Sequence, residues 1–158
     1  MKFKDIFRKW NLDSIKLNLK FAEMEFSPTE DDQTAAWDMY VELITRITTQ
    51  PLAQDEGDEA TALDSVYSIF GLTREILKTK GRDAENFTKI AIVVLNQIIR
   101  PFTAKWHRKK LEGAFGIPAE CLTFRNELID LQIELKKYTK LLAELAKVED
   151  LTVIMEED

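Results

Sequence analysis

Two arginines stand beside apolar helical patterns, and their chemistry suits the binding of an anion. Arg46 lies near the end of one predicted helix, and Arg100 directly follows the apolar run 90–99. In an up-down bundle the first and third helices run in the same direction, so these two positions lie at the same end. With Lys105 or His107 nearby, the guanidinium groups could bind a nucleotide or another phosphate anion. The alternative is a structural ion-pair network with nearby carboxylates, namely Asp38, Glu42 or an acid of the fourth helix.

The segment 100–110 concentrates basic residues around an aromatic side chain. Its candidate contact residues are Trp106, Arg108, Lys109 and Lys110. Such a segment could contact a nucleic-acid backbone while the indole stacks on a base, or it could bind an acidic protein partner. The formal net charge of −6 makes nucleic acid the weaker alternative.

The remaining reactive residue types do not form a catalytic set. His107 is the only histidine, so no multi-histidine metal site exists. Asp38 and Glu42 share a helix face and could hold a divalent cation, although Arg46 stands one turn later and favours a salt bridge instead. Cys121 falls in an apolar helical pattern, where a small buried side chain is expected. We therefore expect no enzyme, no resident metal and no cofactor.

Composition sets the class of protein. The chain has 158 residues, of which 45% are hydrophobic and 32% charged, with 5 Gly and 4 Pro. These values predict one globular, mainly α-helical domain. The single cysteine cannot form an intramolecular disulfide, and no apolar stretch has the length of a signal peptide or a membrane span. We therefore expect a cytoplasmic protein.

Four long helical patterns would position these residues, and they predict an antiparallel four-helix bundle. They cover 27–49, 58–80, 83–112 and 118–148, and the third helix should be kinked at Pro101. The fourth has a heptad seam of apolar residues: Cys121, Phe124, Leu128, Leu131, Leu135, Tyr138, Leu142 and Leu145. Such a seam packs against a neighbouring helix of the bundle or pairs with another chain.

The flanking segments predict smaller elements. Residues 2–10 form a short amphipathic pattern, whereas alternating apolar residues over 15–21 predict a minor β-strand or hairpin near 14–26. Ser27, followed by Pro28 and Glu30, is a predicted start for the first long helix. Asn96 and Gln97 interrupt the most apolar helix and need hydrogen-bond partners. The tail carries the β-prone residues Leu151, Val153 and Ile154, which would either dock on 15–21 or be offered to a partner by strand addition.

These patterns define one helical domain, 1–158, with three parts. Residues 1–26 would form a helix and strand arm, 27–148 the bundle, and 149–158 the tail. The favoured function is that of a non-enzymatic protein-interaction subunit, accessory or regulatory, that forms a homo-oligomer. The alternatives are a ligand-sensing domain with an arginine-lined anion pocket and a nucleic-acid contact through 100–110.

Overall fold

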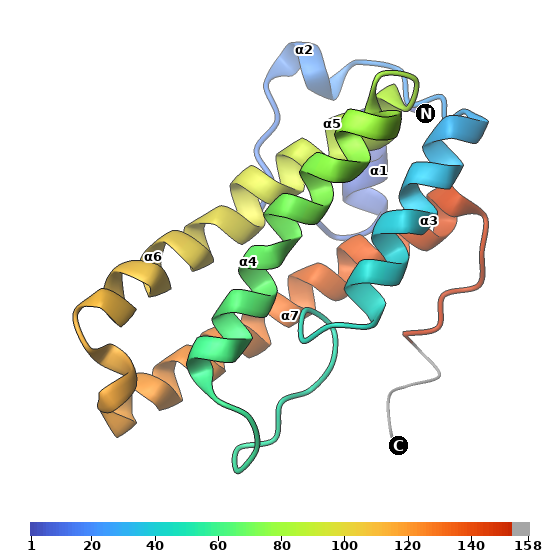
Figure 1. The fold of residues 1–158 in the computed structure, drawn as a ribbon. Coiled ribbons are helices and arrows are strands. Elements are labelled where there is room, and N and C mark those ends of the chain that lie inside the picture. Colours follow the sequence, from blue (N-terminus) through green and yellow to red (C-terminus); the bar gives the residue numbers. More distant parts are fainter. Residues whose placement is uncertain (153–158) are drawn as a thin grey trace.

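The computed structural model describes residues 1–152, and they form a mainly α-helical fold (Figure 1), which confirms the predicted class. No β-strand occurs within this described range. The α-helices are α1 (Phe3–Lys9), α2 (Leu19–Ala22), α3 (Glu30–Ile44), α4 (Glu59–Ile76), α5 (Glu85–Val94), α6 (Arg100–Leu111) and α7 (Pro118–Ala146). Two π-helical turns, η1 (Leu77–Gly81) and η2 (Leu95–Ile99), extend α4 and α5, and a 3₁₀ turn, η3 (Ala114–Gly116), precedes α7.

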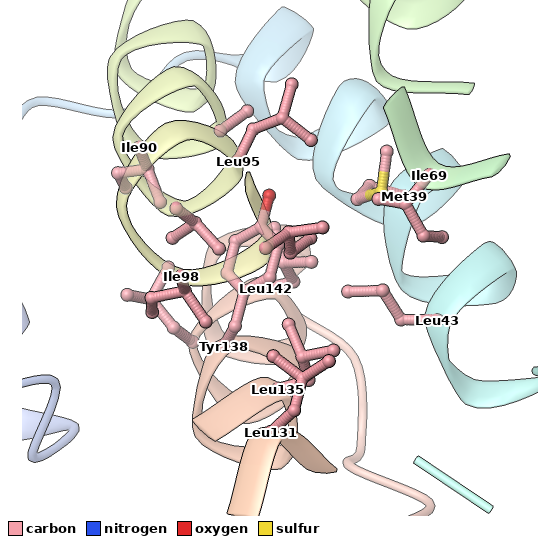
Figure 2. Packing of buried hydrophobic residues seen from close by; sticks show 14 of the residues in the cluster. Met39, Leu43, Ile69, Ile90, Leu95, Ile98, Leu131, Leu135, Tyr138 and Leu142 are labelled. Atoms are coloured by element: carbon pink, nitrogen blue, oxygen red, sulfur yellow. The ribbon is translucent and has the colours of Figure 1, made fainter. Parts of the chain in front are cut away.

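The heptad seam of α7 packs inside the chain. Phe124, Leu135 and Leu142 are each fully buried, and α3 has its most extensive contacts with α7. Figure 2 shows side chains from α3, α4, the α5–η2 stretch and α7 gathered in this core, including Met39, Leu43, Ile69, Ile90, Leu131 and Tyr138. Burial of these side chains is the main stabilising contribution to the fold. The seam is thus occupied by helices of the same chain.

Helical structure continues through Pro101, and the irregularity lies in the residues just before it. Residues 95–99 form the π-helical turn η2, and α6 begins at Arg100 with Pro101 in its first turn. Proline lacks an N–H group and its ring crowds the carbonyl four residues earlier. A π-helical turn moves the hydrogen-bonding register to the fifth residue, which accommodates the proline without ending the helix. In Figure 1, α5 and α6 follow one continuous helical path.

The predicted strand near 14–26 is wrong, whereas the predicted helix over 2–10 is confirmed as α1. Residues 15–18 form no regular structure, and Asn18 caps the short helix α2 by accepting a hydrogen bond from the backbone N–H of Phe21. A strand requires a partner along its length, and the β-type pairing described here is limited to an isolated bridge between Lys2 and Glu25. The alternation had also suggested one buried face, but Leu19 is 79% exposed.

The α1 helix docks on the far end of the chain. Its apolar residues Phe3, Ile6 and Phe7 are buried in the common core. Just after it, the indole Nε1 of Trp10 donates to a carboxylate oxygen of Glu144 at 2.7 Å. Lys9 also pairs with Glu144. The amphipathic pattern therefore serves to attach this segment to the last turns of α7.

The start of α3 differs from the predicted capping box. Thr29 is the N-cap, and Asp32 completes the box by accepting a hydrogen bond from the Thr29 backbone N–H at 2.8 Å. The Asp32 carboxylate is fully buried and also accepts from the backbone N–H of Phe87 and from Asn86 Nδ2, at 2.8 and 2.9 Å. Asp32 thus links the first turns of α3 and α5. This explains why the N-cap of α3 is Thr29, two residues after the predicted cap Ser27.

Candidate functional site

Three of the five Lys and Arg side chains in the basic segment 100–110 pair with carboxylates of the same chain. The ion pairs are those of Lys105 with Glu127, Arg108 with Glu112, and Lys109 with Glu120. The hydrogen bond that Lys109 donates to the Glu120 carboxylate raises the pKa of Lys109. Lys110 is exposed. This pairing lowers the local excess of positive charge that a nucleic-acid backbone would require.

Trp106 is fully buried, so the prediction that it stacks on a partner's base is wrong. Its ring lies parallel to Phe115 with centroids 5.9 Å apart and edge-on to Phe124 at 5.1 Å. Trp106 stands among lysines in the sequence, which suggested an exposed ring. In the structure the ammonium groups of Lys105 and Lys109 lie over the ring and help to cover it. Trp106 therefore belongs to the packing between α6 and α7.

The two arginines of the predicted anion pocket contact α4 at different residues. Arg46 forms an ion pair with Glu42, with Nη2 2.8 Å from the carboxylate, and its Nη1 donates to Ser68 at 3.3 Å. The guanidinium of Arg100 lies over the ring of Phe70 at 4.8 Å, and its Nε donates to Asn96. Arg46 thus makes one of the carboxylate pairs that the alternative, structural interpretation requires.

His107 and Lys105 point to different helices. His107 lies edge-on to Tyr67 with centroids 4.8 Å apart, and Tyr67 in turn contacts Phe70. The structure therefore brings Arg100 and His107 to the same aromatic pair of α4. Lys105 instead pairs with Glu127 of α7.

The candidate metal and thiol residues are engaged in local interactions. Asp38 pairs with Lys80, and within residues 1–152 no group of three or more His, Cys, Asp or Glu side chains could hold a metal ion. The Cys121 thiol donates to the carbonyl of Phe115 at 3.3 Å. Its burial, followed by the nearby Glu59 carboxylate, raises the pKa of Cys121, which disfavours the thiolate that nucleophilic chemistry needs.

The described part of the tail docks on α3. The backbone N–H of Leu151 donates to the Tyr40 hydroxyl at 2.6 Å, and Tyr40 donates to Asp150 at 3.3 Å. Thr152 is buried, whereas Leu151 is 40% exposed. Val153 and Ile154 lie outside the described residues.

A second apolar row runs along the outward side of α7, and it was not identified from the sequence. Leu122, Ile129 and Ile133 are each about half exposed, at 50%, 51% and 50%. With Asn126 they occupy successive positions four, three and four residues apart, which places them on one face of the helix, away from the buried seam. The same heptad spacing that identified the inner seam could have indicated this outer row.

A groove of about 390 Å³ lies between the η2–α6 stretch and α7. We call it the α6–α7 groove. Its apolar lining residues are Ile98, Pro101, Phe102 and Leu131, and its charged ones are Lys105, Glu127, Asp130 and Glu134. Ser14, Gln97 and Trp106 also line the groove, and Ser14 belongs to the 12–18 segment. Of the four predicted pocket cations, Lys105 alone lines this groove, and acids outnumber it there.

No helix among residues 1–152 combines the length and apolarity needed to cross a membrane. Comparison of the chain with family models, with curated proteins and with solved structures finds no match. The surfaces from which a function can be inferred are therefore the outer row of α7, the α6–α7 groove and the side of α4 on which Arg100 and His107 lie.

Proposed function

We propose that this protein is a non-enzymatic interaction subunit, accessory or regulatory, that self-associates through the outer row of α7. In this proposal the four long helical stretches form an antiparallel bundle, with the third bent at Pro101, and the bundle acts as a rigid support for that row. The observation that carries the proposal is the pair of apolar faces on α7. One is buried inside the chain, and the other exposes Leu122, Ile129 and Ile133.

The length and spacing of the row suit a helix partner. Leu122, Asn126, Ile129 and Ile133 follow the alternating spacing of a coiled-coil seam. The row extends over about 17 Å at 1.5 Å rise per residue. Such a short seam supports a weak association, and the polar Asn126 within it would select one register over others.

The row is complementary to itself, which favours a second copy of this chain as the occupant. When two copies pair in antiparallel orientation about a two-fold axis through the middle of the row, Leu122 of one copy faces Ile133 of the other, and Asn126 faces Ile129. The symmetry repeats each of these contacts.

Sedimentation velocity tests the proposal between about 1 and 300 µM, a range suited to weak interfaces. We expect the sedimentation coefficient to rise with concentration for the unmodified chain and to stay at the monomer value for Ile129→Ser. Ile92→Ser is the matched control, because Ile92 is also an exposed helical isoleucine, at 43%, but lies on α5. A monomer throughout this range, or equal loss of association in both variants, would refute the proposal.

A further inference from the structure

The side of α4 that lies beside α6 carries basic and aromatic residues at its surface. The two helices are in contact. Tyr67, Gly71 and Arg74 are separated by four and three residues, so they share one face of α4, and all three are exposed. His107 of α6 lies edge-on to Tyr67, and the exposed Arg100 belongs to the same helix. We call the surface formed by these five residues the α4–α6 face.

Two arginines of this face lie about one helical turn apart and have no carboxylate partner. The guanidinium of Arg100 lies over the ring of Phe70, 4.8 Å from its centroid. Arg74 follows Phe70 by one turn of α4, and side chains four residues apart on a helix are neighbours. Neither arginine forms an ion pair with another residue of the range 1–152. An acidic group from outside would therefore relieve the repulsion between two like charges.

The guanidinium of Arg100 is already held in position. Its Nε donates to Oδ1 of Asn96 at 3.0 Å, and one side of its plane covers Phe70. Its two terminal nitrogens form no hydrogen bond to the described residues, so they remain available to an acceptor. A guanidinium group can bind a carboxylate through two parallel hydrogen bonds. Because the side chain is ordered before binding, less conformational entropy is lost when a partner arrives.

Gly71 leaves an open space on the same face. It lies inside α4 and is not among the glycines with positive φ, and no atom lies within 4 Å of an added Cβ. Neither the backbone nor the packing of the described residues therefore requires glycine here, although glycine destabilises a helix relative to alanine. The absence of a side chain allows the backbone of a second helix to approach α4 closely.

The face suits an acidic helix of another protein. Tyr and Arg are among the residue types that contribute most to the energy of protein interfaces, and Tyr67 is 49% exposed. Cations supplied by two helices match carboxylates that are spaced along one side of a partner helix. A nucleic-acid backbone is the weaker match, because the chain as a whole has a net charge of −6.

We propose that the α4–α6 face binds an acidic helix of a partner protein. Glutamates of that helix bind Arg74 and Arg100, its backbone crosses α4 at Gly71, and an apolar side chain contacts Tyr67. This proposal is independent of self-association, because the outer row through which the chain would pair with itself lies on α7.

A synthetic helix tests the proposal directly. The probe is an alanine-based peptide of about 20 residues, long enough to form a helix in water, with glutamates and one leucine on one side. The matched peptide has glutamine in place of each glutamate. At about 20 mM salt, where surface charges are weakly screened, we expect the ¹H–¹⁵N signal of Gly71 to move with a dissociation constant of about 0.1–1 mM for the acidic peptide. The neutral peptide should bind at least about tenfold more weakly.

Variants of the chain make the test specific. Arg74→Gln with Arg100→Gln should weaken binding of the acidic peptide at least about tenfold. Arg8→Gln with Arg108→Gln removes the same net charge from exposed positions outside the face and should leave binding unchanged. Gly71→Leu should weaken binding without unfolding the protein, because the added side chain meets open space within the fold.

The outcomes separate the proposals. An unmoved Gly71 signal, equal binding of the two peptides, or equal binding by the two double variants would overturn the acidic-helix proposal. Tighter binding of a single-stranded oligothymidylate at the same residues would overturn it in favour of nucleic acid. A normal response to the acidic peptide combined with a monomeric chain would refute self-association alone.

Discussion

The side-chain amide of Gln97 binds both backbone polar groups of Lys16. Its Oε1 atom accepts from the Lys16 N–H at 2.7 Å, and its Nε2 atom donates to the Lys16 carbonyl at 2.8 Å. This is the pair of hydrogen bonds that a neighbouring β-strand would make. A helix side chain thus takes the place of a partner strand at Lys16, within the irregular stretch 15–18.

Replacing Gln97 should loosen that segment. Gln97→Ala removes both hydrogen bonds, so we expect faster hydrogen exchange of the Lys16 amide and a loss of about 1–2 kcal/mol in the free energy of unfolding. Asn96→Ala is the control, because the Asn96 side chain accepts from Arg100 within the same helical stretch. Hydrogen–deuterium exchange measures the difference, and unchanged protection over 12–18 in Gln97→Ala would contradict this role.

Substitution of the buried Asp32 should lower the free energy of unfolding more than substitution of most other polar residues. Asp32→Ala leaves the Phe87 N–H, the Asn86 amide and the Thr29 N–H without their acceptor. Because these groups are largely removed from water, we expect a loss of about 2–4 kcal/mol, measured by urea unfolding. Asp31→Ala alters an exposed acid in the same first turn and should change stability by less than about 0.5 kcal/mol. Equal effects of the two substitutions would exclude the bridging role.

Acid should weaken the attachment of α1 to the segment that follows it. Hydrogen bonds from Lys2 and then Lys4 lower the pKa of Glu23 from its ordinary value of about 4.5 to about 2. A lowered folded-state pKa means that the ionised form stabilises the fold above about pH 4.5, and this contribution disappears as the pH falls toward 2. An NMR titration of the Glu23 carboxyl should therefore show a midpoint near 2.

Removing both lysines supplies the comparison. With Lys2→Met and Lys4→Met together, the Glu23 midpoint should return toward 4.5. Lys20→Met, on the adjacent helix α2, should leave it unchanged. A midpoint near 4.5 in the unmodified chain would rule out these hydrogen bonds in solution.

Replacement of Gly71 and of Gly113 by alanine should change the stability of the protein in opposite directions. Gly71 lies within α4, and nothing lies within 4 Å of an added Cβ, so Gly71→Ala should stabilise the protein by about 0.5–1 kcal/mol. Gly113 has equal space but a φ of +82°, so Gly113→Ala should destabilise it by about 1–2 kcal/mol. Chemical unfolding with unchanged m-values checks both, and shifts of the same sign would contradict the conformational explanation.

Long helices were predictable because their periodicity and caps agree. Pro118 begins α7, as the sequence indicated, and α4 begins at Glu59, one residue after the predicted start at 58. The C-terminal end of α3 was placed five residues too late. There the hydroxyls of Thr48 and Thr49 bind the Leu43 carbonyl, at 2.9 and 2.8 Å, and provide an alternative to further helical hydrogen bonds.

Contacts with residues distant in the sequence determine conformations and burial that local patterns could not predict. The alternation over 15–21 resembles a strand, but the Lys16 backbone pairs with the distant Gln97 amide and Asn18 begins the helix α2. Trp106 stands among lysines in the sequence, yet contacts with Phe115 and Phe124 bury it. The α6–α7 groove combines residues from separate helices, and no spacing within one helix predicts which of them meet.

The contact between Trp10 and Glu144 joins residues 134 positions apart, and this separation has a consequence for synthesis of the protein. At about 5–20 residues per second, roughly 7–27 seconds pass between translation of the two. During that interval the apolar residues Phe3, Ile6 and Phe7 have been made but lack the part of α7 on which their segment docks. A nascent chain therefore presents an amphipathic segment that chaperones can recognise until translation of α7 is complete.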